Sequence, residues 1–145
     1  MERQEYNERI FTSKGMEVRL NYLLDTCIFI DYLRGNQSVY DLLINDDKIK
    51  LSMSTVTMME LMIGAFSKRE VQFIQKAFKE IDIIYIDNEI SKLAEKLIQN
   101  YAKSHNLQID DALIAATSIK RGIELVTYNI SDFHYIPNIS LYKFF

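Results

Sequence analysis

Apolar residues along this chain follow two spacings. Short apolar runs rich in β-branched residues predict buried strands, and segments with apolar positions three and four residues apart predict amphipathic helices. The predicted strands cover residues 20–25, 50–53, 83–86, 124–127 and a last short one around 141–142. The predicted helices cover 26–33, 38–44, 55–65, 69–80, 88–101 and 110–122, with a polar loop at 128–132. Strands that alternate with helices predict an α/β layer structure with a parallel sheet.

One domain is expected to hold this pattern. The chain has 145 residues, of which 48% are hydrophobic and 26% charged, the length and balance of a single globular domain. Residues 1–19 are polar and carry mixed charge, and the periodic pattern begins only after Met16. We therefore interpret 1–19 as an N-terminal extension or lead-in and 20–145 as the folded domain.

Charge and cysteine content narrow the classes of partner. A formal net charge of −3 gives no global signature of a nucleic-acid binder, so nucleic acid would be met by a local patch or through metal ions. The single Cys27 cannot form an intrachain disulfide, and the polar N-terminus lacks the pattern of a signal peptide. No apolar run approaches the roughly 20 residues of a membrane span. We expect a cytoplasmic protein that does not enter a membrane.

Several common kinds of site are excluded by spacing. The four glycines are too scattered for a phosphate-binding loop or a dinucleotide fingerprint. His105 and His134 belong to no HExxH pattern, and there is no Cys/His cluster of zinc spacing. The nucleophile elbow GxSxG is also absent. Carboxylates at particular positions remain as the candidates for chemistry.

These carboxylates lie at the ends of predicted strands or in helices. Asp25 comes where a buried strand meets a helix, the place where open α/β sheets carry their chemistry, although it or Thr26 could simply cap the helix. Glu60 has apolar neighbours on both sides, which favours a functional role over a solvated stripe. Asp110 and Asp111 open a helix whose capping needs only one acid. We expect Asp111 to face the site and Asp110 to lie nearer solvent or to cap the helix.

Two more acids and an amide extend this set. Asn129 and Asp132 lie in the polar loop after a predicted strand, and we expect Asp31, in the first helix, to be exposed or paired with Arg34. Carboxylates that converge on one place must share protons or bind a cation, because like charges repel strongly at close range. Oxygen ligands favour Mg²⁺ or Mn²⁺, ions that assist in-line attack on a phosphodiester.

Four segments of the chain resemble the motifs of PIN-domain ribonucleases, specifically the VapC-like toxins of type II toxin–antitoxin systems. They are 23–35 (LLDTCIFIDYLRG), 52–61 (SMSTVTMMEL), 111–117 (DALIAAT) and 125–133 (LVTYNISDF). The third segment is the most specific match. One motif alone would be a weak signal, but all four occur in order and at family-like separations across residues 20–145.

The resemblance implies a fold and a site. The fold is the PIN fold over 20–145, a central parallel sheet flanked by helices. The implied site residues are Asp25, Glu60, Asp111, Asp132, Asn129 and Thr127. The first three are acids that hold Mg²⁺ or Mn²⁺, and the fourth metal position is open between Asp132 and Asn129, because family members differ there. An amide at that position leaves open whether one or two metal ions bind. Thr127 resembles a hydroxyl that contacts metal-bound water.

The implied activity is endonucleolytic hydrolysis of RNA by metal-activated water. The resemblance also implies a homodimer and a cognate VapB-like antitoxin whose C-terminal segment enters a groove. Five cations are candidates for contacts with RNA phosphates, although each is equally an ordinary exposed side chain: Arg34, Lys68, Arg69, Lys120 and Arg121. The sequence does not identify which RNA is cleaved.

Two other functions are compatible with parts of the sequence. A catalytically silent PIN-like module that binds RNA or protein is favoured by the amide at Asn129. A phosphotransferase of the haloacid-dehalogenase type would also use a strand-end aspartate such as Asp25. That chemistry needs a second aspartate two residues later, where Cys27 stands, so it is disfavoured.

Overall fold

The computed structural model describes residues 10–11, 17–18 and 20–144. Within them, a four-stranded sheet has the order β5–β4–β3–β6, and all of its strands are parallel. The strands are β3 (Leu20–Leu24), β4 (Ile49–Ser54), β5 (Asp82–Ile84) and β6 (Glu124–Val126). The predicted parallel α/β fold is therefore confirmed, with β3 between β4 and β6.

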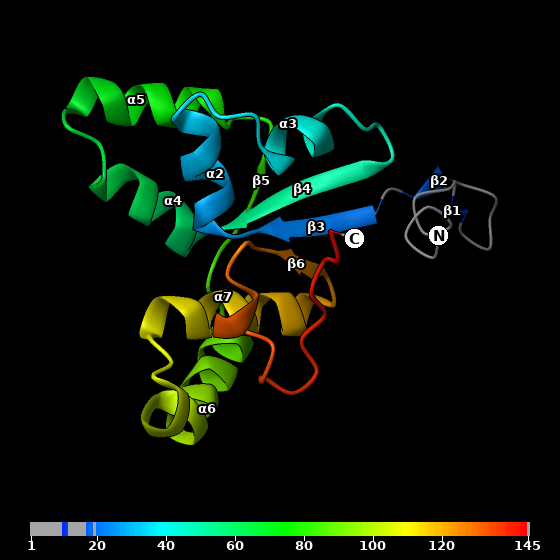
Figure 1. Cartoon of the computed structure of the whole chain (residues 1–145), viewed down its shortest axis with the longest axis vertical. Coiled ribbons are helices and arrows are strands. Elements are labelled where there is room, and N and C mark those ends of the chain that lie inside the picture. Colours follow the sequence, from blue (N-terminus) through cyan, green and yellow to red (C-terminus); the bar gives the residue numbers. More distant parts are fainter. Residues whose placement is uncertain (1–9, 12–16, 19, 145) are drawn as a thin grey trace.

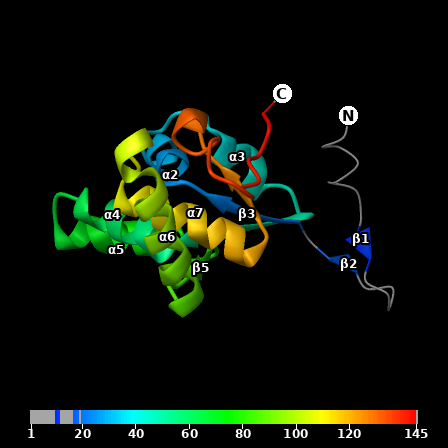
Figure 2. The same cartoon turned by 90° about the horizontal axis from the view of Figure 1, so that it is seen from below.

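Helices cover both faces of this sheet (Figure 1). One face carries α2 (Thr26–Leu33), α3 (Val39–Ile44), α4 (Thr55–Ile63) and α5 (Lys68–Ala77). The other face carries α6 (Asn88–His105) and α7 (Ile109–Arg121), which lie in front of the sheet in the view from below (Figure 2). The helices predicted from apolar spacing are all present, with ends shifted by a few residues.

The sheet separates two apolar clusters. Successive side chains of a strand point to opposite faces, so Leu24 packs with the α2–α5 cluster while Leu23 packs with the α6–α7 cluster. In the first cluster the rings of Phe29 and Phe78 meet edge to face at 4.9 Å. In the second, fully buried alanines such as Ala115 let α7 approach its neighbours closely. Apolar side chains therefore hold both faces of the sheet against helices, and this packing fixes the positions of the strand ends.

Helix caps match the signals in the sequence. Asp25, Ser54 and Asp87 are the N-caps of α2, α4 and α6, and each side chain accepts a backbone N–H of the first turn. At the end of α7, Gly122 has a φ of 64°, a left-handed conformation that glycine adopts without strain. The predicted end of that helix at Gly122 is confirmed.

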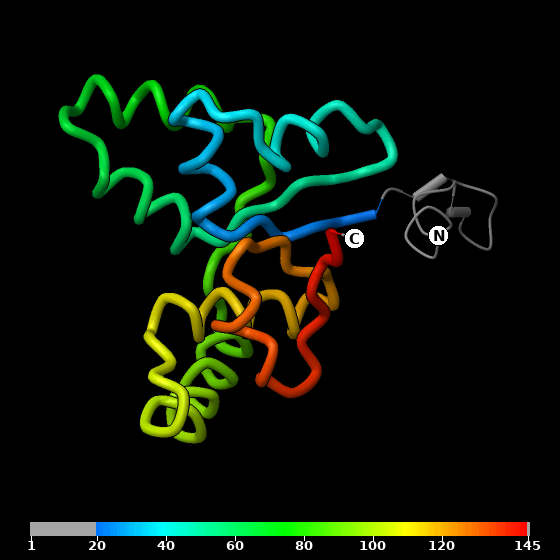
Figure 3. The backbone as a smooth tube through the Cα atoms, viewed as in Figure 1, coloured from blue at the N-terminus to red at the C-terminus, as the bar shows by residue number. Residues whose placement is uncertain are grey.

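The structure differs from the predictions in its last third and at its start. The loop at 128–132 contains a 3-10 turn, η1 (Ile130–Asp132). The strand predicted around 141–142 is only a single bridge from Leu141 to Leu125, because this segment returns beside β6 for one residue pair (Figure 3). Near the start, β1 (Ile10–Phe11) and β2 (Glu17–Val18) form a separate antiparallel pair. The rest of the predicted lead-in, residues 1–9, 12–16 and 19, lies outside the described residues.

None of the helices among the described residues has the length and apolar character to cross a membrane.

Candidate active site

The candidate site lies at the carboxyl edge of the parallel sheet, where α2, α4 and α7 begin (Figure 1). Asp25 follows β3 directly, and Thr127 follows the neighbouring strand β6. Glu60 lies on α4, which follows β4, and Asp110 and Asp111 are in the first turn of α7. Parallel strands end at a common edge, so these segments bring their side chains together there.

Asp25 is the most buried of the acids, with 5% of its surface exposed. Its backbone N–H donates to the carbonyl of Val126 at 2.9 Å, which extends the β3–β6 pairing by one residue and fixes its position. Its Oδ2 accepts the Thr127 hydroxyl at 2.8 Å, and its Oδ1 accepts the N–H of Thr26 at 2.8 Å. Burial raises the pKa of Asp25 above its ordinary value, and these hydrogen bonds offset part of that effect.

Thr127 and Cys27 support the Asp25 carboxylate. The Thr127 hydroxyl is fully buried, donates to Asp25 and accepts the backbone N–H of Asn129 at 3.0 Å. The Cys27 thiol lies 3.7 Å from the same carboxylate oxygen, and burial raises the pKa of this thiol, so it stays protonated as a weak donor. Thr127 therefore orients Asp25 and also anchors the loop that follows β6.

Glu60 faces the site, as its apolar neighbours predicted. Its Oε1 accepts the Thr26 hydroxyl at 2.7 Å, and that hydroxyl lies 3.0 Å from the hydroxyl of Thr57. Burial raises the pKa of Glu60, and a hydrogen bond with Asp110 and the charge of Asp110 raise it further. Two carboxyl groups this close must share a proton or have a cation beside them.

Both acids at the start of α7 lie near other carboxylates, although Asp110 was expected to lie nearer solvent or to cap the helix. The N-cap of α7 is Gln108, and Asp110 lies in the first turn of the helix, where its Oδ1 accepts the N–H of Asp111 at 2.9 Å. Its carboxyl group also forms a hydrogen bond with Glu60, because the first turn of α7 lies near α4. The pKa of Asp111 is raised to about 7, first by burial and then by four negative charges: Asp110, Asp25, Asp132 and Glu60.

The loop after β6 contributes Asp132 and Asn129 in different ways. Asp132 is exposed, but its charge helps to raise the pKa of Asp111, so its carboxylate is within electrostatic range of the other acids. Asn129 is held through its backbone: its N–H donates to Thr127 and its carbonyl accepts the N–H of Asp132 at 3.0 Å. This arrangement favours Asp132 over Asn129 as the fourth acid position.

The candidate phosphate-binding cations do not gather around these acids. Arg121 and Lys120 form ion pairs with Asp87 at 3.0 Å and Glu89 at 3.8 Å, which tie the end of α7 to the start of α6. That end lies about 15 Å along the helix from Asp111. The remaining three, Arg34, Lys68 and Arg69, are exposed at the end of α2 and the start of α5.

Asp31 is not paired with Arg34, contrary to one of the two expectations for it. Its carboxylate accepts the side-chain amide of Asn36 at 2.8 Å and the hydroxyl of Tyr128 at 3.2 Å. Tyr128 also accepts the backbone N–H of Val39 at 3.3 Å. This network connects the end of α2 and the start of α3 to the loop after β6, outside the group of acids.

The hydroxyls that hold Glu60 were not predicted from the sequence. Thr26 was expected only as a possible helix cap, and Thr57 was not singled out. A usable signal existed for Thr57, because it is a polar residue inside an otherwise apolar helix segment and is fully buried. Its contact with Thr26 joins residues 31 positions apart, so only the packing of α4 against α2 reveals it.

A divalent cation fits this set of donors. All the charged groups that act on Asp111 are carboxylates, the oxygen ligands that Mg²⁺ and Mn²⁺ prefer. Among residues 20–144, no Lys or Arg forms an ion pair with any of these acids. In the same part of the chain, no group of three or more His, Cys, Asp or Glu side chains has the spacing of a complete metal site.

Comparison with known proteins agrees with this geometry. Residues 22–137 match the model of the PIN domain family. Ribonuclease VapC19 of Mycobacterium tuberculosis is 30% identical over 122 residues, covering 81% of this chain and 95% of the relative. A toxin–antitoxin complex from Klebsiella pneumoniae has a chain that is 32% identical, with a TM-score of 0.68 over 81% of this chain and 94% of that one. VapBC2 from Rickettsia felis, bound to a promoter DNA fragment, shares the fold with a TM-score of 0.71 at 24% identity, over 85% of this chain and 98% of that one. The chain therefore belongs to the PIN domain family, alongside the VapC ribonucleases.

Proposed function

We propose that this protein is a metal-dependent endoribonuclease and the toxin of a toxin–antitoxin pair. The observation that carries the proposal is that carboxylates from the start of α2, from α4 and from the start of α7 lie at one edge of the sheet, near enough that their charges add to the effect of burial in raising the pKa of Asp111 to about 7. The similarity to a ribonuclease and to a chain of a toxin–antitoxin complex supports the same activity. The competing function, a silent RNA- or protein-binding module, has support only from the amide at Asn129.

Each site residue has a distinct part in this proposal. Asp25, Glu60, Asp111 and Asp132 would hold Mg²⁺ or Mn²⁺. When bound, such an ion supplies an activated water and offsets the charge on the leaving 3′-oxygen. Thr127 and Thr26 orient the carboxylates of Asp25 and Glu60 through hydrogen bonds of 2.8 and 2.7 Å. Because these hydroxyls are locked by packing, the carboxylates are held in place before an ion arrives.

The purified protein should cleave unstructured single-stranded RNA in the presence of Mg²⁺ or Mn²⁺, and a chelator should abolish the cleavage. Cleavage products from an end-labelled oligoribonucleotide, resolved on a gel, measure this activity. Ca²⁺, whose geometry is looser, serves as the control ion and should support weaker cleavage or none. RNA binding without cleavage under every ionic condition would instead favour the silent module.

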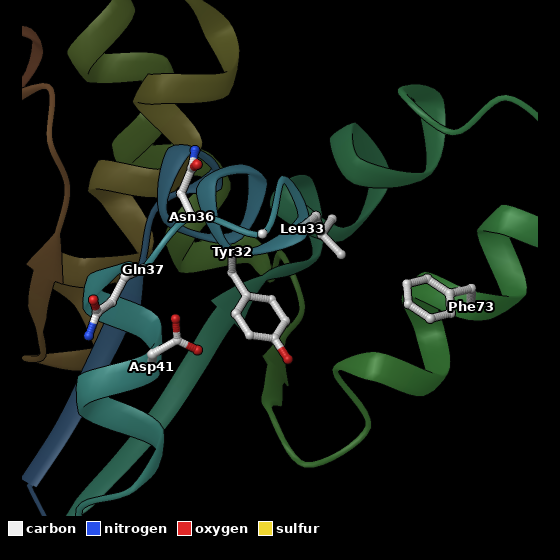
Figure 4. A pocket seen from close by; sticks show the side chains of 7 residues that line it. Tyr32, Leu33, Asn36, Gln37, Asp41 and Phe73 are labelled. Atoms are coloured by element: carbon white, nitrogen blue, oxygen red, sulfur yellow. The ribbon is translucent and has the colours of Figure 1, made fainter.

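An open pocket of about 480 Å³, lined by both apolar and polar side chains, offers a place for an antitoxin segment. It lies between the end of α2, the start of α3 and α5, and Figure 4 shows Tyr32 and Leu33 on one side with Phe73 on the other. Phe73 is 62% exposed, an unusual state for a phenylalanine on a helix. We propose that a cognate VapB-like antitoxin inserts apolar side chains here, against Phe73; the similarity to a chain of the Klebsiella toxin–antitoxin complex supports an antitoxin as partner.

Phe73→Asp should weaken antitoxin binding at least tenfold, because it places a charge where an apolar side chain would be buried. Cleavage of RNA by the free variant should stay within twofold of the unaltered protein. Tyr85→Asp is the matched control, since Tyr85 is a similarly exposed aromatic residue (66%) that does not line this cavity. Equal losses of affinity in both variants, measured by calorimetry with the cognate antitoxin, would contradict the assignment of the cavity.

A homodimer, which the family resemblance implies, and a cytoplasmic location complete the proposal. Ile63 and Phe66, at the turn between α4 and α5, are 84% and 96% exposed and supply an apolar surface that a second copy could cover. Exposed apolar patches of this kind are typical of protein interfaces. Sedimentation equilibrium of the purified protein at micromolar concentration measures its oligomeric state directly.

A further inference from the structure

Four aromatic side chains gather at the end of α6 and just after η1. The rings of His105 and Tyr135 are stacked, with centroids 4.1 Å apart and planes at 16°. Tyr101 meets both rings edge-on, at 5.6 Å from His105 and 5.2 Å from Tyr135. His134 meets Tyr135 at 6.1 Å with planes at 83°. We call these residues the aromatic cluster; the proposed mechanism uses none of them.

The aromatic cluster adjoins the acids of the candidate site. His105 precedes Asp110 by five residues, and Tyr135 follows Asp132 by three, a span of about 11 Å at most. The charges of Asp111 and Asp132 contribute to raising the pKa of Tyr135, after burial, so the phenol lies within electrostatic range of both carboxylates. The stack thus joins the segment that leads into α7 to the segment that carries Asp132.

One face of the stack is open. The centroid of the Tyr101 ring is about equally far from the centroids of His105 and Tyr135, so Tyr101 lies at the side of the stack. If Tyr101 covered the outer face of His105, its ring would be much farther from Tyr135 than from His105. The His105 side chain is exposed, whereas Tyr101 and Tyr135 are half-buried and pack against the α6–α7 core. The half-buried rings therefore serve folding, and the outer face of His105 remains available to a planar ligand.

An acidic nuclease must hold RNA by means other than phosphate contacts alone. The chain has a net charge of −3, and Lys120 and Arg121 are engaged with acids of α6. Phosphates approaching the carboxylates are repelled wherever no cation lies between them. Stacking of bases on aromatic rings needs no positive charge and accepts any base, because every base has a flat face.

We propose that the aromatic cluster binds an unpaired base of the RNA, stacked on the outer face of His105, next to the phosphate that is cleaved. This inference rests on the proposed ribonuclease function and adds to it a subsite that holds one base of the RNA beside the cut. A base inside a duplex cannot present its face to His105, so paired RNA is excluded from this subsite.

The test uses short unstructured oligoribonucleotides that carry the fluorescent base 2-aminopurine at one position at a time. The full-length Asp25→Asn variant binds them in Mn²⁺ without the complication of cleavage. We expect strong quenching at one or two adjacent positions only. His105→Ala in the same background should remove this quenching and raise the dissociation constant at least fivefold, whereas His105→Phe, which keeps a ring, should retain both. Tyr85→Ala, another exposed aromatic residue, is the control and should change neither.

An abasic nucleotide at the quenched position separates stacking from a general effect. It should weaken binding to the Asp25→Asn protein at least fivefold and should not weaken binding further when His105→Ala is present. RNA cleavage by the unaltered protein, measured in parallel, tests the ribonuclease function itself. If the protein cleaves RNA but quenching is uniform along the RNA or absent, the subsite is wrong and the nuclease function is unaffected. The same conclusion follows if the losses of affinity from the abasic site and from His105→Ala are additive. A change of oligomeric state in His105→Ala also overturns it, whereas absence of both binding and cleavage overturns the nuclease.

Discussion

Asp25→Asn is expected to lower the rate of RNA cleavage by about three orders of magnitude. The substitution keeps the size of the side chain, an oxygen that can accept the N–H of Thr26, and in place of Oδ2 an amide that can donate to the Thr127 hydroxyl 2.8 Å away. It removes the negative charge that the cation needs, at the most buried acid of the site. A thousandfold loss corresponds to about 4 kcal/mol of transition-state stabilisation, the scale of a lost metal ligand. Single-turnover cleavage of an end-labelled oligoribonucleotide measures it.

The same substitution should leave the fold intact or make it more stable. Burial raises the pKa of Asp25, which means that the ionised carboxylate is disfavoured in the folded protein. Replacing it by a neutral amide removes that cost, so the melting temperature without metal should stay equal or rise. Loss of activity together with unfolding would therefore not match the prediction.

Asp31→Asn is the control for this experiment. Asp31 lies on the same helix, but its carboxylate bonds to Asn36 and Tyr128 instead of facing the other acids. Cleavage by this variant should remain within about twofold of the unaltered protein. If Asp25→Asn and the unaltered protein cleave RNA equally fast, the enzyme function is wrong; if neither cleaves, the silent module becomes the better account.

Much of the site could be predicted because its signals are local. The end of the first strand is visible in the sequence, where an apolar run stops at Asp25, and the parallel arrangement then places this residue at the functional edge. Glu60 stands out because an acid between apolar neighbours must either be solvated or have a partner. In both cases a single segment carries enough information to locate the side chain.

The features that could not be predicted depend on how distant segments pack. Asp110 turned toward Glu60 because the start of α7 faces α4, which no pattern within either helix encodes. Arg121 pairs with Asp87 across 34 positions, and Tyr128 reaches Asp31 across 97. The short bridge at Leu141 likewise depends on the path of the returning chain and not on local strand propensity. Long-range contacts of this kind decide which face of an element a polar side chain occupies.

Asp111→Asn should stabilise the metal-free protein increasingly as pH rises from about 4 to 7. The pKa of Asp111 is raised to about 7 in the folded state, against 3.8 for an unperturbed group. Between these values the folded protein holds a proton that the unfolded chain has lost, so stability falls as pH rises through this window and is constant above it. The full shift would correspond to about 4 kcal/mol, which partial exposure and solvent screening reduce to about 2 kcal/mol.

Comparing the two proteins isolates this effect, because all other titrating groups are common to both. The difference in free energy of unfolding, from urea titrations monitored by circular dichroism, should be near its minimum at pH 4 and reach its plateau above pH 7. Parallel curves for the two proteins across the whole range would contradict the assigned pKa and with it the crowding of Asp110, Asp25, Asp132 and Glu60 around Asp111.

Mn²⁺ should reverse the order of stability at pH 7.5. A cation among the carboxylates offsets their repulsion, and at a concentration one hundred times its dissociation constant it stabilises the folded protein by about 2.7 kcal/mol. Asp111→Asn lacks one ligand and should gain much less, so the unaltered protein becomes the more stable of the two. Asp31→Asn should respond to Mn²⁺ as the unaltered protein does. A melting temperature of the unaltered protein that millimolar Mn²⁺ leaves unchanged would contradict the metal site, since a cation that binds only the folded protein must raise its stability.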